Sequence, residues 1–424
     1  MTEVKGGVCA PKGFLAGGVR CGIKPSSQKK DLALIYSKSP CAAAAMFTTN
    51  KVKAASVIVS KENIADGKLR AVIANSGNAN ACTGAEGMES ARRMAQLAGD
   101  ALKININEVA VASTGVIGVT LPIGAIEKGI DSLKMSLRDD ENGNEDALEA
   151  IMTTDTRKKE IAIEIEIGGK PVRIGAIAKG SGMIHPNMAT MLAFVTTDAA
   201  ITSSALDLSL RHAVRHSFNR LTVDGDTSTN DMIVIMANGE AQNAPVIKNG
   251  AGTQNTRPNI DAPWLNEGDL EIFTCALEYV CVALTKMMAR DGEGATKLVT
   301  VTVNGAQCRA TAQALAKSIA SSSLVKAACF GADANWGRVL CAMGYSGVDF
   351  EPDKTDISFK SCEGEIQVCK DGMTCHFSEE KAKKILSQEE IEIEVTLYEG
   401  DGAASVWGCD LTYDYVKING DYRS

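Results

Sequence analysis

The sequence predicts a layered α/β protein, because strand-like and helix-like segments alternate along the whole chain. Short apolar runs rich in β-branched residues alternate with amphipathic segments of helical period, both before and after residue 190. At 424 residues the chain exceeds one ordinary core, so two or three packed units are expected. Its 39 glycines against 10 prolines favour many tight turns over disorder.

A hairpin is the clearest local prediction in the first half of the chain. Residues 160–167 alternate acidic and apolar side chains, Gly168-Gly169 follows as a turn signal, and residues 173–178 supply the partner strand. Residues 86–103 predict a helix with one apolar face. The other predicted elements are a helix at residues 139–152 and strands at residues 31–37, 55–60, 69–75 and 109–112.

The second half of the chain repeats this alternation. A buried strand is predicted at residues 190–196, and helices are predicted at residues 203–219 and 269–291. Residues 390–397 and 404–410 are predicted to pair as strands around the turn at residues 399–402. The remaining predicted elements are strands at residues 232–237 and 299–303 and a helix from residue 312 to residue 326.

Charge and hydropathy exclude two classes of partner. The net charge is −8 with acidic and basic residues intermixed, which argues against binding to nucleic acid or to an anionic membrane surface. Residues 1–12 have no apolar core, and the sequence shows no uninterrupted apolar run of about 18 residues. We therefore expect a cytoplasmic protein of enzyme size.

The 13 cysteines and 4 histidines do not predict a metal site. The cysteines are odd in number and form no CxxC pair, so buried free thiols in a reducing compartment explain them most simply. His212 and His216 are spaced i,i+4 on a predicted helix, a spacing that can hold a metal. Because no HExxH pattern accompanies them, we interpret them as a surface pair and expect no metal.

The segment from Lys179 to Asp198, KGSGMIHPNMATMLAFVTTD, is the most unusual in the chain. Small and polar residues change abruptly into the apolar strand that Thr190 opens. Composition by itself favours an ordinary loop entering a buried strand, and spacing does not distinguish Thr190. A threonine at the start of a rigid strand is nevertheless well placed for a nucleophile.

Self-cleavage would make this threonine reactive. The Oγ atom of Thr190 would attack the carbonyl of Ala189, and water would hydrolyse the resulting ester. Thr190 would then carry a free α-amino group, whose pKa of about 7.7–8.0 leaves a neutral fraction able to accept the hydroxyl proton. Acyl transfer also needs oxyanion donors, and Thr114-Gly115 in the turn at residues 113–118 can supply a hydroxyl and a backbone N–H. For the glycines of STGVIG taken alone, an ordinary strand-to-helix turn is the favoured explanation.

Three further polar clusters admit a functional and an ordinary interpretation. Residues 223–231, VDGDTSTND, could bind a cation but lack the calcium-loop layout, so we favour a hydrogen-bonded turn network. Residues 290–297, RDGEGATK, place Glu293 between glycines, where it is either solvated or binds an amine. Residues 330–338, FGADANWGR, form a glycine-bracketed loop of common composition.

In their order along the chain, these segments closely resemble the ornithine acetyltransferase family, the bifunctional glutamate N-acetyltransferases of arginine biosynthesis. One local departure is TTDTRKK, where family members usually have a proline before the lysine. The segments that carry the resemblance are GGVRCGIK, NSGNANACTG, STGVIG, TTDT, KGSGMIHPNMATMLAF, VDGDTSTND, RDGEGATK, FGADANWGR and YVKINGDYRS.

The resemblance implies a layered α/β sandwich of the self-processing ornithine acetyltransferase type, with an N-terminal threonine nucleophile. Cleavage between Ala189 and Thr190 would give an α chain of residues 1–189 and a β chain of residues 190–424, which assemble as a heterotetramer of two of each. Thr114 and Gly115 match the oxyanion pair. The positions that match substrate-binding residues are Thr153, Lys179, Thr190, Glu293, Asn419 and Ser424, although Thr154 is an equally polar neighbour of Thr153.

The implied reaction is a ping-pong transfer of acetyl from N2-acetylornithine to Thr190 and then to glutamate, giving ornithine and N-acetylglutamate. It requires neither a metal nor an organic cofactor. Lys179 suits the substrate carboxylate, and Glu293 suits the ornithine amine. Whether acetyl-CoA is a second donor stays open. The alternatives are a self-processing aminopeptidase or amidohydrolase, in which water takes the acyl group, and a non-catalytic amino-acid-binding or regulatory protein.

Overall fold

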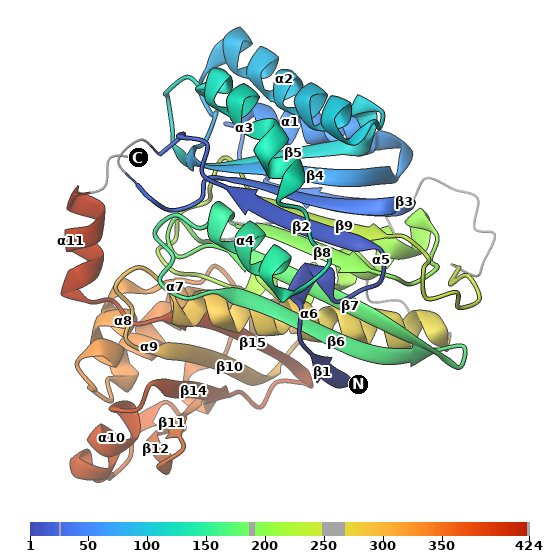
Figure 1. Ribbon diagram of the computed structural model, residues 1–424. Coiled ribbons are helices and arrows are strands. Elements are labelled where there is room, and N and C mark those ends of the chain that lie inside the picture. The colour runs from blue at the N-terminus through green and yellow to red at the C-terminus, as the bar shows by residue number, and fades with distance from the viewer. Residues whose placement is uncertain (25–26, 186–190, 248–267, 422–424) are drawn as a thin grey trace.

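The computed structural model describes residues 1–24, 27–185, 191–247 and 268–421, which form two packed α/β units (Figure 1). The larger unit contains a nine-stranded sheet in the order β1-β6-β7-β8-β9-β3-β4-β5, with β2 paired to β3. Its strands are β1 (Thr2–Val4), β2 (Phe14–Val19), β3 (Leu32–Phe47), β4 (Lys68–Asn78), β5 (Val109–Val116), β6 (Lys159–Ile167), β7 (Lys170–Lys179), β8 (Leu192–Thr197) and β9 (Met232–Ala237).

The long strand β3 divides this sheet into two halves that face each other. Its residues 32–36 pair with β4, and after a register shift its residues 42–47 pair with β9. Val72 of β4 lies in the same buried apolar cluster as Phe194 of β8 and Val234 of β9. The core between the halves therefore joins strands from both sides of residue 190, as expected for a layered α/β sandwich.

Helices cover the two outer faces of this sandwich. The face formed by β4 and β5 is covered by the apolar side of α2, where Met94 and Ala98 are buried together with Ile73. The face formed by β6 to β9 is covered by α5 and α6. The helices of the larger unit are α1 (Ala55–Asn63), α2 (Gly84–Leu102), α3 (Ile123–Met135), α4 (Glu141–Ile151), α5 (Ser203–His216) and α6 (Asp269–Arg290).

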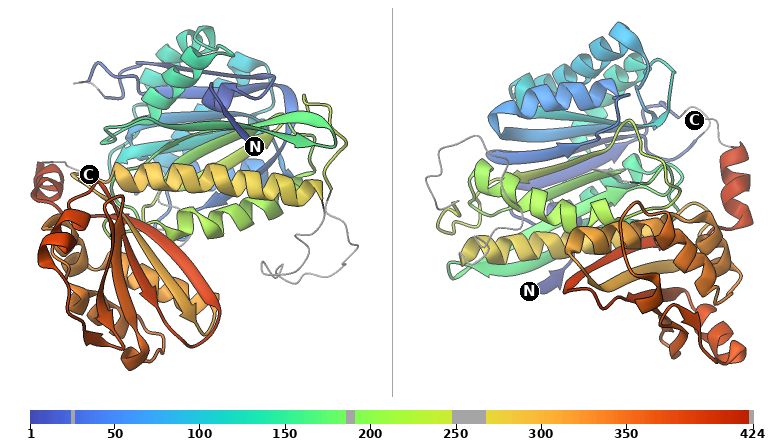
Figure 2. Two further views of the ribbon diagram at one scale, coloured as in Figure 1. Left: turned by 90° about the horizontal axis from the view of Figure 1, so that it is seen from below. Right: turned by 180° about the vertical axis from the view of Figure 1, so that it is seen from behind.

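The smaller unit has a six-stranded sheet in the order β13-β12-β11-β14-β10-β15 and its own apolar core. Figure 2 shows α6 lying between this unit and the larger one. Its strands are β10 (Leu298–Ala306), β11 (Asp356–Ser361), β12 (Gly364–Lys370), β13 (Met373–Thr374), β14 (Glu390–Thr396) and β15 (Gly402–Cys409). Its helices are α7 (Arg309–Ser321), α8 (Ser323–Phe330), α9 (Trp336–Gly344) and α10 (Glu379–Leu386), followed by the terminal helix α11 (Tyr413–Asp421).

By length and composition α6 could cross a membrane, with a mean hydropathy of 1.5 in its most apolar window. The structure gives it the position of a core helix. Its Phe273 and Leu284 are fully buried in the cluster that also holds Ile163 of β6 and Trp407 of β15. Contact with both sheets explains why this helix is apolar around so much of its circumference.

The structure corrects several local predictions. Residues 55–60 form the start of α1 rather than a strand, because the helix packs along β5. Val57 and Val59 are buried in two different apolar clusters, and the Ser60 hydroxyl donates to the Val111 carbonyl. The predicted pairing of residues 390–397 with residues 404–410 is wrong, since β10 lies between β14 and β15. The predicted helix at residues 312–326 is divided into α7 and α8, and α3 was not predicted.

The prediction that the cysteines are buried is only partly right. All 13 cysteines carry free thiols in the structure. Five of these thiols are exposed, at Cys82, Cys275, Cys308, Cys341 and Cys362, and therefore cannot be explained as core packing.

Candidate active site

A polar cavity of about 130 Å³ lies where β5, β7 and β8 meet the turn after α6. Met191, immediately before β8, forms part of its wall. Six of the predicted site residues line it, namely Thr114, Gly115, Thr153, Lys179, Glu293 and Asn419. The other described residues at the cavity are Ile117, Thr154, Gly180, Gly182, Met183, Met191, Leu192, Ser228, Thr229, Asn230 and Asp231. Ala189, Thr190 and Ser424 lie outside the described residues.

Lys179 is the central cation of this cavity. As the last residue of β7 it is buried to all but 8%. Its Nζ atom donates to the Thr153 hydroxyl at 2.6 Å and to the Thr114 hydroxyl at 3.4 Å. The lysine thus joins a predicted oxyanion residue to a predicted substrate residue. The adjacent Thr154 hydroxyl instead contacts Ser181 Oγ at 2.7 Å, which distinguishes the two threonines that the sequence left equivalent.

A buried ion-pair network supports Lys179 from behind. Asp155 lies 3.7 Å from Lys179 and accepts hydrogen bonds from Lys159 Nζ at 2.7 Å and from the Gly180 backbone N–H at 2.7 Å. Lys159, itself fully buried, also pairs with Asp291. Burial opposes ionisation of Asp155, but the charges of Lys179 and Lys159 hold the pKa of its carboxyl well below the ordinary value. No local pattern in the sequence indicated this network.

The Thr114-Gly115 pair lies at the end of β5 rather than in a free turn, because the strand continues to Val116. Gly115 has a φ of +134°, and a Cβ atom there would lie 2.3 Å from the Gly77 carbonyl carbon. Only glycine allows β5 to approach β4 this closely. Asn230 fixes the same region by donating its side-chain amide to the Ser113 carbonyl at 2.8 Å.

Gly115→Ala is expected to lower kcat by about 100- to 1000-fold, because the backbone clash displaces the proposed oxyanion donors. Steady-state acetyl transfer measures this loss. Gly118→Ala is the matched control: Gly118 also has positive φ, +77°, but open space surrounds its Cβ position. Equal losses in both variants would contradict the assignment to Gly115.

Glu293 faces Lys179's cavity from the turn after α6. Its Oε2 atom accepts a hydrogen bond from the Asn419 side-chain amide at 2.8 Å, which brings α11 to the cavity. Its backbone N–H donates to the Ser181 carbonyl at 2.8 Å. A Cβ atom on Gly182 would lie 2.3 Å from Glu293 Oε2, so the glycine makes room for the carboxylate. The cavity therefore holds a cation and an anion.

The segment at residues 223–231 forms the predicted hydrogen-bonded turn network. Asp224 accepts the backbone N–H groups of Met183 and Ile184 at 2.5 and 2.7 Å, and the Thr227 hydroxyl donates to the His185 carbonyl at 2.8 Å. The network holds the segment that leads toward residue 190.

Asp231 is a functional candidate that sequence analysis did not single out. It is buried to all but 2% and lines the cavity, and its Oδ2 atom has no hydrogen-bond partner among the described residues. Burial raises the pKa of its carboxyl well above the ordinary value. In the sequence, Asp231 stands out only as the last residue of the polar cluster at residues 223–231, directly before the apolar strand at residues 232–237.

Two other predicted clusters lie elsewhere. The segment at residues 330–338 runs from the end of α8 through a loop at residues 331–335 into α9, and it does not line the cavity. The interpretation of His212 and His216 as a surface pair is wrong, since they are exposed by only 7% and 4%. Both turn inward from α5 because α6 packs against this side of the helix.

Comparisons with known proteins place these features in a family. The ArgJ family model matches residues 15–424. The arginine biosynthesis bifunctional protein ArgJ of Symbiobacterium thermophilum is 50% identical over 425 residues, covering 100% of both chains. The protein of the same name from Caldanaerobacter subterraneus subsp. tengcongensis is 48% identical over 424 residues, again covering 100% of both.

Two solved structures are also similar. Arginine biosynthesis bifunctional protein ArgJ from Bacillus halodurans is 45% identical with a TM-score of 0.48, covering 55% of this chain and 100% of its own. Ornithine acetyltransferase complexed with ornithine from Mycobacterium tuberculosis is 40% identical with a TM-score of 0.41, covering 43% of this chain and 96% of its own. The family match confirms the resemblance carried by the ordered sequence motifs: the chain belongs to the ArgJ family.

Proposed function

We propose that this chain transfers acetyl from N2-acetylornithine to glutamate in the acetyl cycle of arginine biosynthesis, through an acetyl ester on Thr190. The observation that carries the proposal is the cavity in which Thr114, Gly115, Lys179 and Glu293 surround the start of β8. An oxyanion site, a cation and an anion around one point suit an acyl transfer between amino acids.

Self-cleavage between Ala189 and Thr190 is the activation step of this proposal. The Thr190 hydroxyl attacks the Ala189 carbonyl, the peptide C–N bond breaks as the ester forms, and water hydrolyses the ester. The products are a carboxylate on Ala189 and a free α-amine on Thr190. The sheet supports continued association, because β8 of the second chain pairs with β7 of the first along its whole length.

In the first half-reaction the neutral α-amine accepts the Thr190 hydroxyl proton as Oγ attacks the acetyl carbonyl of N2-acetylornithine. The Thr114 hydroxyl and the Gly115 N–H stabilise the oxyanion. The intermediate collapses with return of the proton to the leaving nitrogen, and ornithine departs. Glutamate then attacks the ester through its neutral amine, so N-acetylglutamate leaves and Thr190 Oγ regains its proton.

Two oppositely charged side chains of the cavity, Lys179 and Glu293, orient the substrates. Lys179 pairs with the α-carboxylate that both substrates carry, and Glu293 with the side-chain amine that only ornithine carries. Thr153 and Asn419 fix these two groups through their hydrogen bonds to Lys179 and Glu293. Ser424 is assigned to the same substrate region by its match to the family motif.

Glu293→Gln is expected to raise KM for N2-acetylornithine about ten- to a hundredfold, because a charge-assisted hydrogen bond to the amine is lost. KM for glutamate changes less, since glutamate carries no side-chain amine. Initial rates with each substrate varied separately measure both constants. The exposed Glu86→Gln serves as control, and an equal rise in both KM values would contradict the assignment.

Acceptor dependence tests the transferase against an amidohydrolase or aminopeptidase. Purified protein is incubated with N2-acetylornithine alone and with added glutamate, and ornithine, acetate and N-acetylglutamate are measured. We expect ornithine release to depend on glutamate and to match N-acetylglutamate formation. Rapid release of acetate that glutamate leaves unchanged would contradict the transferase.

Two further features complete the proposal. Acetyl-CoA serves as a second donor, and release of its thiol in the presence of glutamate tests this activity.

The cleaved chains assemble in the cytoplasm as a heterotetramer of two α and two β chains. Light scattering combined with intact-mass spectrometry measures the assembly, and a single uncut 424-residue species would contradict it.

A further inference from the structure

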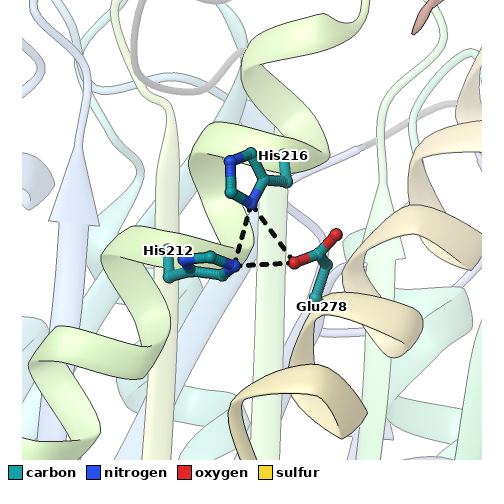
Figure 3. A group of neighbouring side chains, drawn as sticks. All are labelled: His212, His216 and Glu278. Carbon is teal, nitrogen blue, oxygen red and sulfur yellow. Dashed lines mark hydrogen bonds and ion pairs between the residues drawn. The ribbon is translucent and has the colours of Figure 1, made fainter. Parts of the chain in front are cut away.

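Three potential ligand atoms converge between α5 and α6, away from the acetyl-transfer cavity (Figure 3). His212 Nε2 lies 2.9 Å from Glu278 Oε2, His216 Nδ1 lies 3.2 Å from the same oxygen, and the two ring nitrogens are 2.9 Å apart. The i,i+4 spacing on α5 places both rings on one side of that helix, opposite Glu278 on α6.

Hydrogen bonds alone do not satisfy this triangle of atoms. If both ring nitrogens donate to the carboxylate, two N–H groups face each other across the short N–N contact. If one ring donates to the other, the accepting nitrogen presents a lone pair to the carboxylate oxygen. In either arrangement, one of the three contacts between these atoms is therefore unfavourable. A cation above the three atoms would engage all three lone pairs at once.

We propose that His212, His216 and Glu278 bind one divalent transition-metal cation of the Zn²⁺ class. Two imidazoles and one carboxylate are a zinc-binding set, with metal–ligand distances of about 2.0–2.2 Å and so ligand–ligand distances of about 3.3 Å in a tetrahedron. The observed separations of 2.9 to 3.2 Å need only a small expansion. Glu278 is 33% exposed at its side chain, which leaves water access to a fourth position.

The surroundings set the strength of this site. Arg220 is buried and interacts electrostatically with Glu278, and the positive charge of Arg309 acts on both Arg220 and His216. The outer ring nitrogens, His212 Nδ1 and His216 Nε2, have no partner among the described residues, whereas zinc-bound imidazoles usually have an acceptor there. Both features weaken binding relative to a structural zinc site, so we expect micromolar rather than tighter affinity.

The cation would clamp two helices that lead to the acetyl-transfer cavity. α5 follows β8, the strand that begins just after Thr190, and α6 ends at Arg290, directly before Asp291 and the turn that carries Glu293. Binding only to the folded state, the ion would stabilise this arrangement by mass action. The site is thus structural, and acetyl transfer requires no metal chemistry.

Zn²⁺ titration of the full-length, self-processed protein tests the proposal. The exposed thiols are first alkylated, and bound metal is removed by chelation and dialysis. We expect one saturable Zn²⁺ per 424-residue chain and a rise in Tm on Zn²⁺ addition. Co²⁺ should give a d–d spectrum without a sulfur charge-transfer band, as nitrogen and oxygen ligands require.

Ligand variants distinguish this site from adventitious binding. His212→Asn and Glu278→Gln should each weaken Zn²⁺ binding at least about tenfold and abolish the Tm rise. Removing a residue that only hydrogen-bonds to a metal ligand already weakens binding by about that factor, and removing the ligand itself should cost at least as much. The exposed His376→Asn should behave as the parent. Circular dichroism confirms folding, and Glu278→Gln preserves side-chain shape. Absence of saturable binding, or equal binding in the ligand variants, would overturn the proposal.

Discussion

Thr190→Ala is expected to abolish self-cleavage and to lower acetyl transfer by about four to six orders of magnitude, the scale seen when a catalytic nucleophile is removed. One hydroxyl serves both reactions in the proposed mechanism. Without it the Ala189–Thr190 bond stays intact, no terminal amine forms, and no acetyl ester can accumulate.

The described neighbours of Thr190 explain why a single side chain should have such an effect. Met191 lines the cavity, and its carbonyl accepts the Met232 N–H at 2.9 Å. Leu192 is paired with Lys179 on one side and with Met232 on the other. The strand that follows Thr190 is therefore fixed by hydrogen bonds on both edges, and no nearby threonine can shift register to replace it.

Intact-mass spectrometry measures cleavage, and initial rates measure transfer. Thr190→Ser is the conservative variant and should retain both reactions at reduced rates, because it keeps a hydroxyl. The exposed Thr120→Ala controls for loss of a threonine outside the cavity. A cleaved Thr190→Ala product would refute the proposed nucleophile.

Lys159→Met is expected to cost about 3–5 kcal/mol of unfolding free energy, the usual result of removing one partner from a buried ion pair. Lys159 is fully buried and pairs with both Asp155 and Asp291. Its removal leaves two buried carboxylates with too little compensating charge. Because Asp155 also contacts Lys179, KM for both substrates should rise as well.

The destabilisation caused by Lys159→Met is expected to depend on pH in a defined direction. The pKa of the Asp155 carboxyl is held below its ordinary value, so its stabilisation is present above the unfolded pKa of about 3.9 and is lost as pH falls through the folded pKa. In Lys159→Met the Asp155 carboxylate loses one of its two neighbouring cations, and its protonation as the pH falls relieves that destabilisation. The difference in unfolding free energy between Lys159→Met and the parent protein should therefore become smaller as the pH falls toward about 3.9.

Urea unfolding at several pH values measures this difference. Lys158→Met is the matched control, because the Lys158 side chain is 46% exposed and pairs with Glu145 at the surface. Such a pair contributes about 0–1 kcal/mol. Equal destabilisation by the two substitutions would contradict the role given to the buried network.

Local sequence signals were sufficient to predict the elements that pair with a neighbouring segment of the chain. The β6–β7 hairpin was predicted because alternation and the Gly168-Gly169 turn act within one short segment. The β14–β15 pairing failed because β10, far earlier in the chain, takes the place between them. α1 was mistaken for a strand because β-branched residues favour strands unless packing overrides the preference.

The sequence by itself determined the family, the alternating α/β class and the residues whose chemistry suits acetyl transfer, since these depend on residue type and order. Only the tertiary structure decided which groups are buried together. It brought Asp155, Lys159 and Asp291 behind Lys179, and it turned His212 and His216 from an expected surface pair into a buried cluster with Glu278. The physical reason is that burial and charge pairing depend on contacts between distant segments, which no local pattern records.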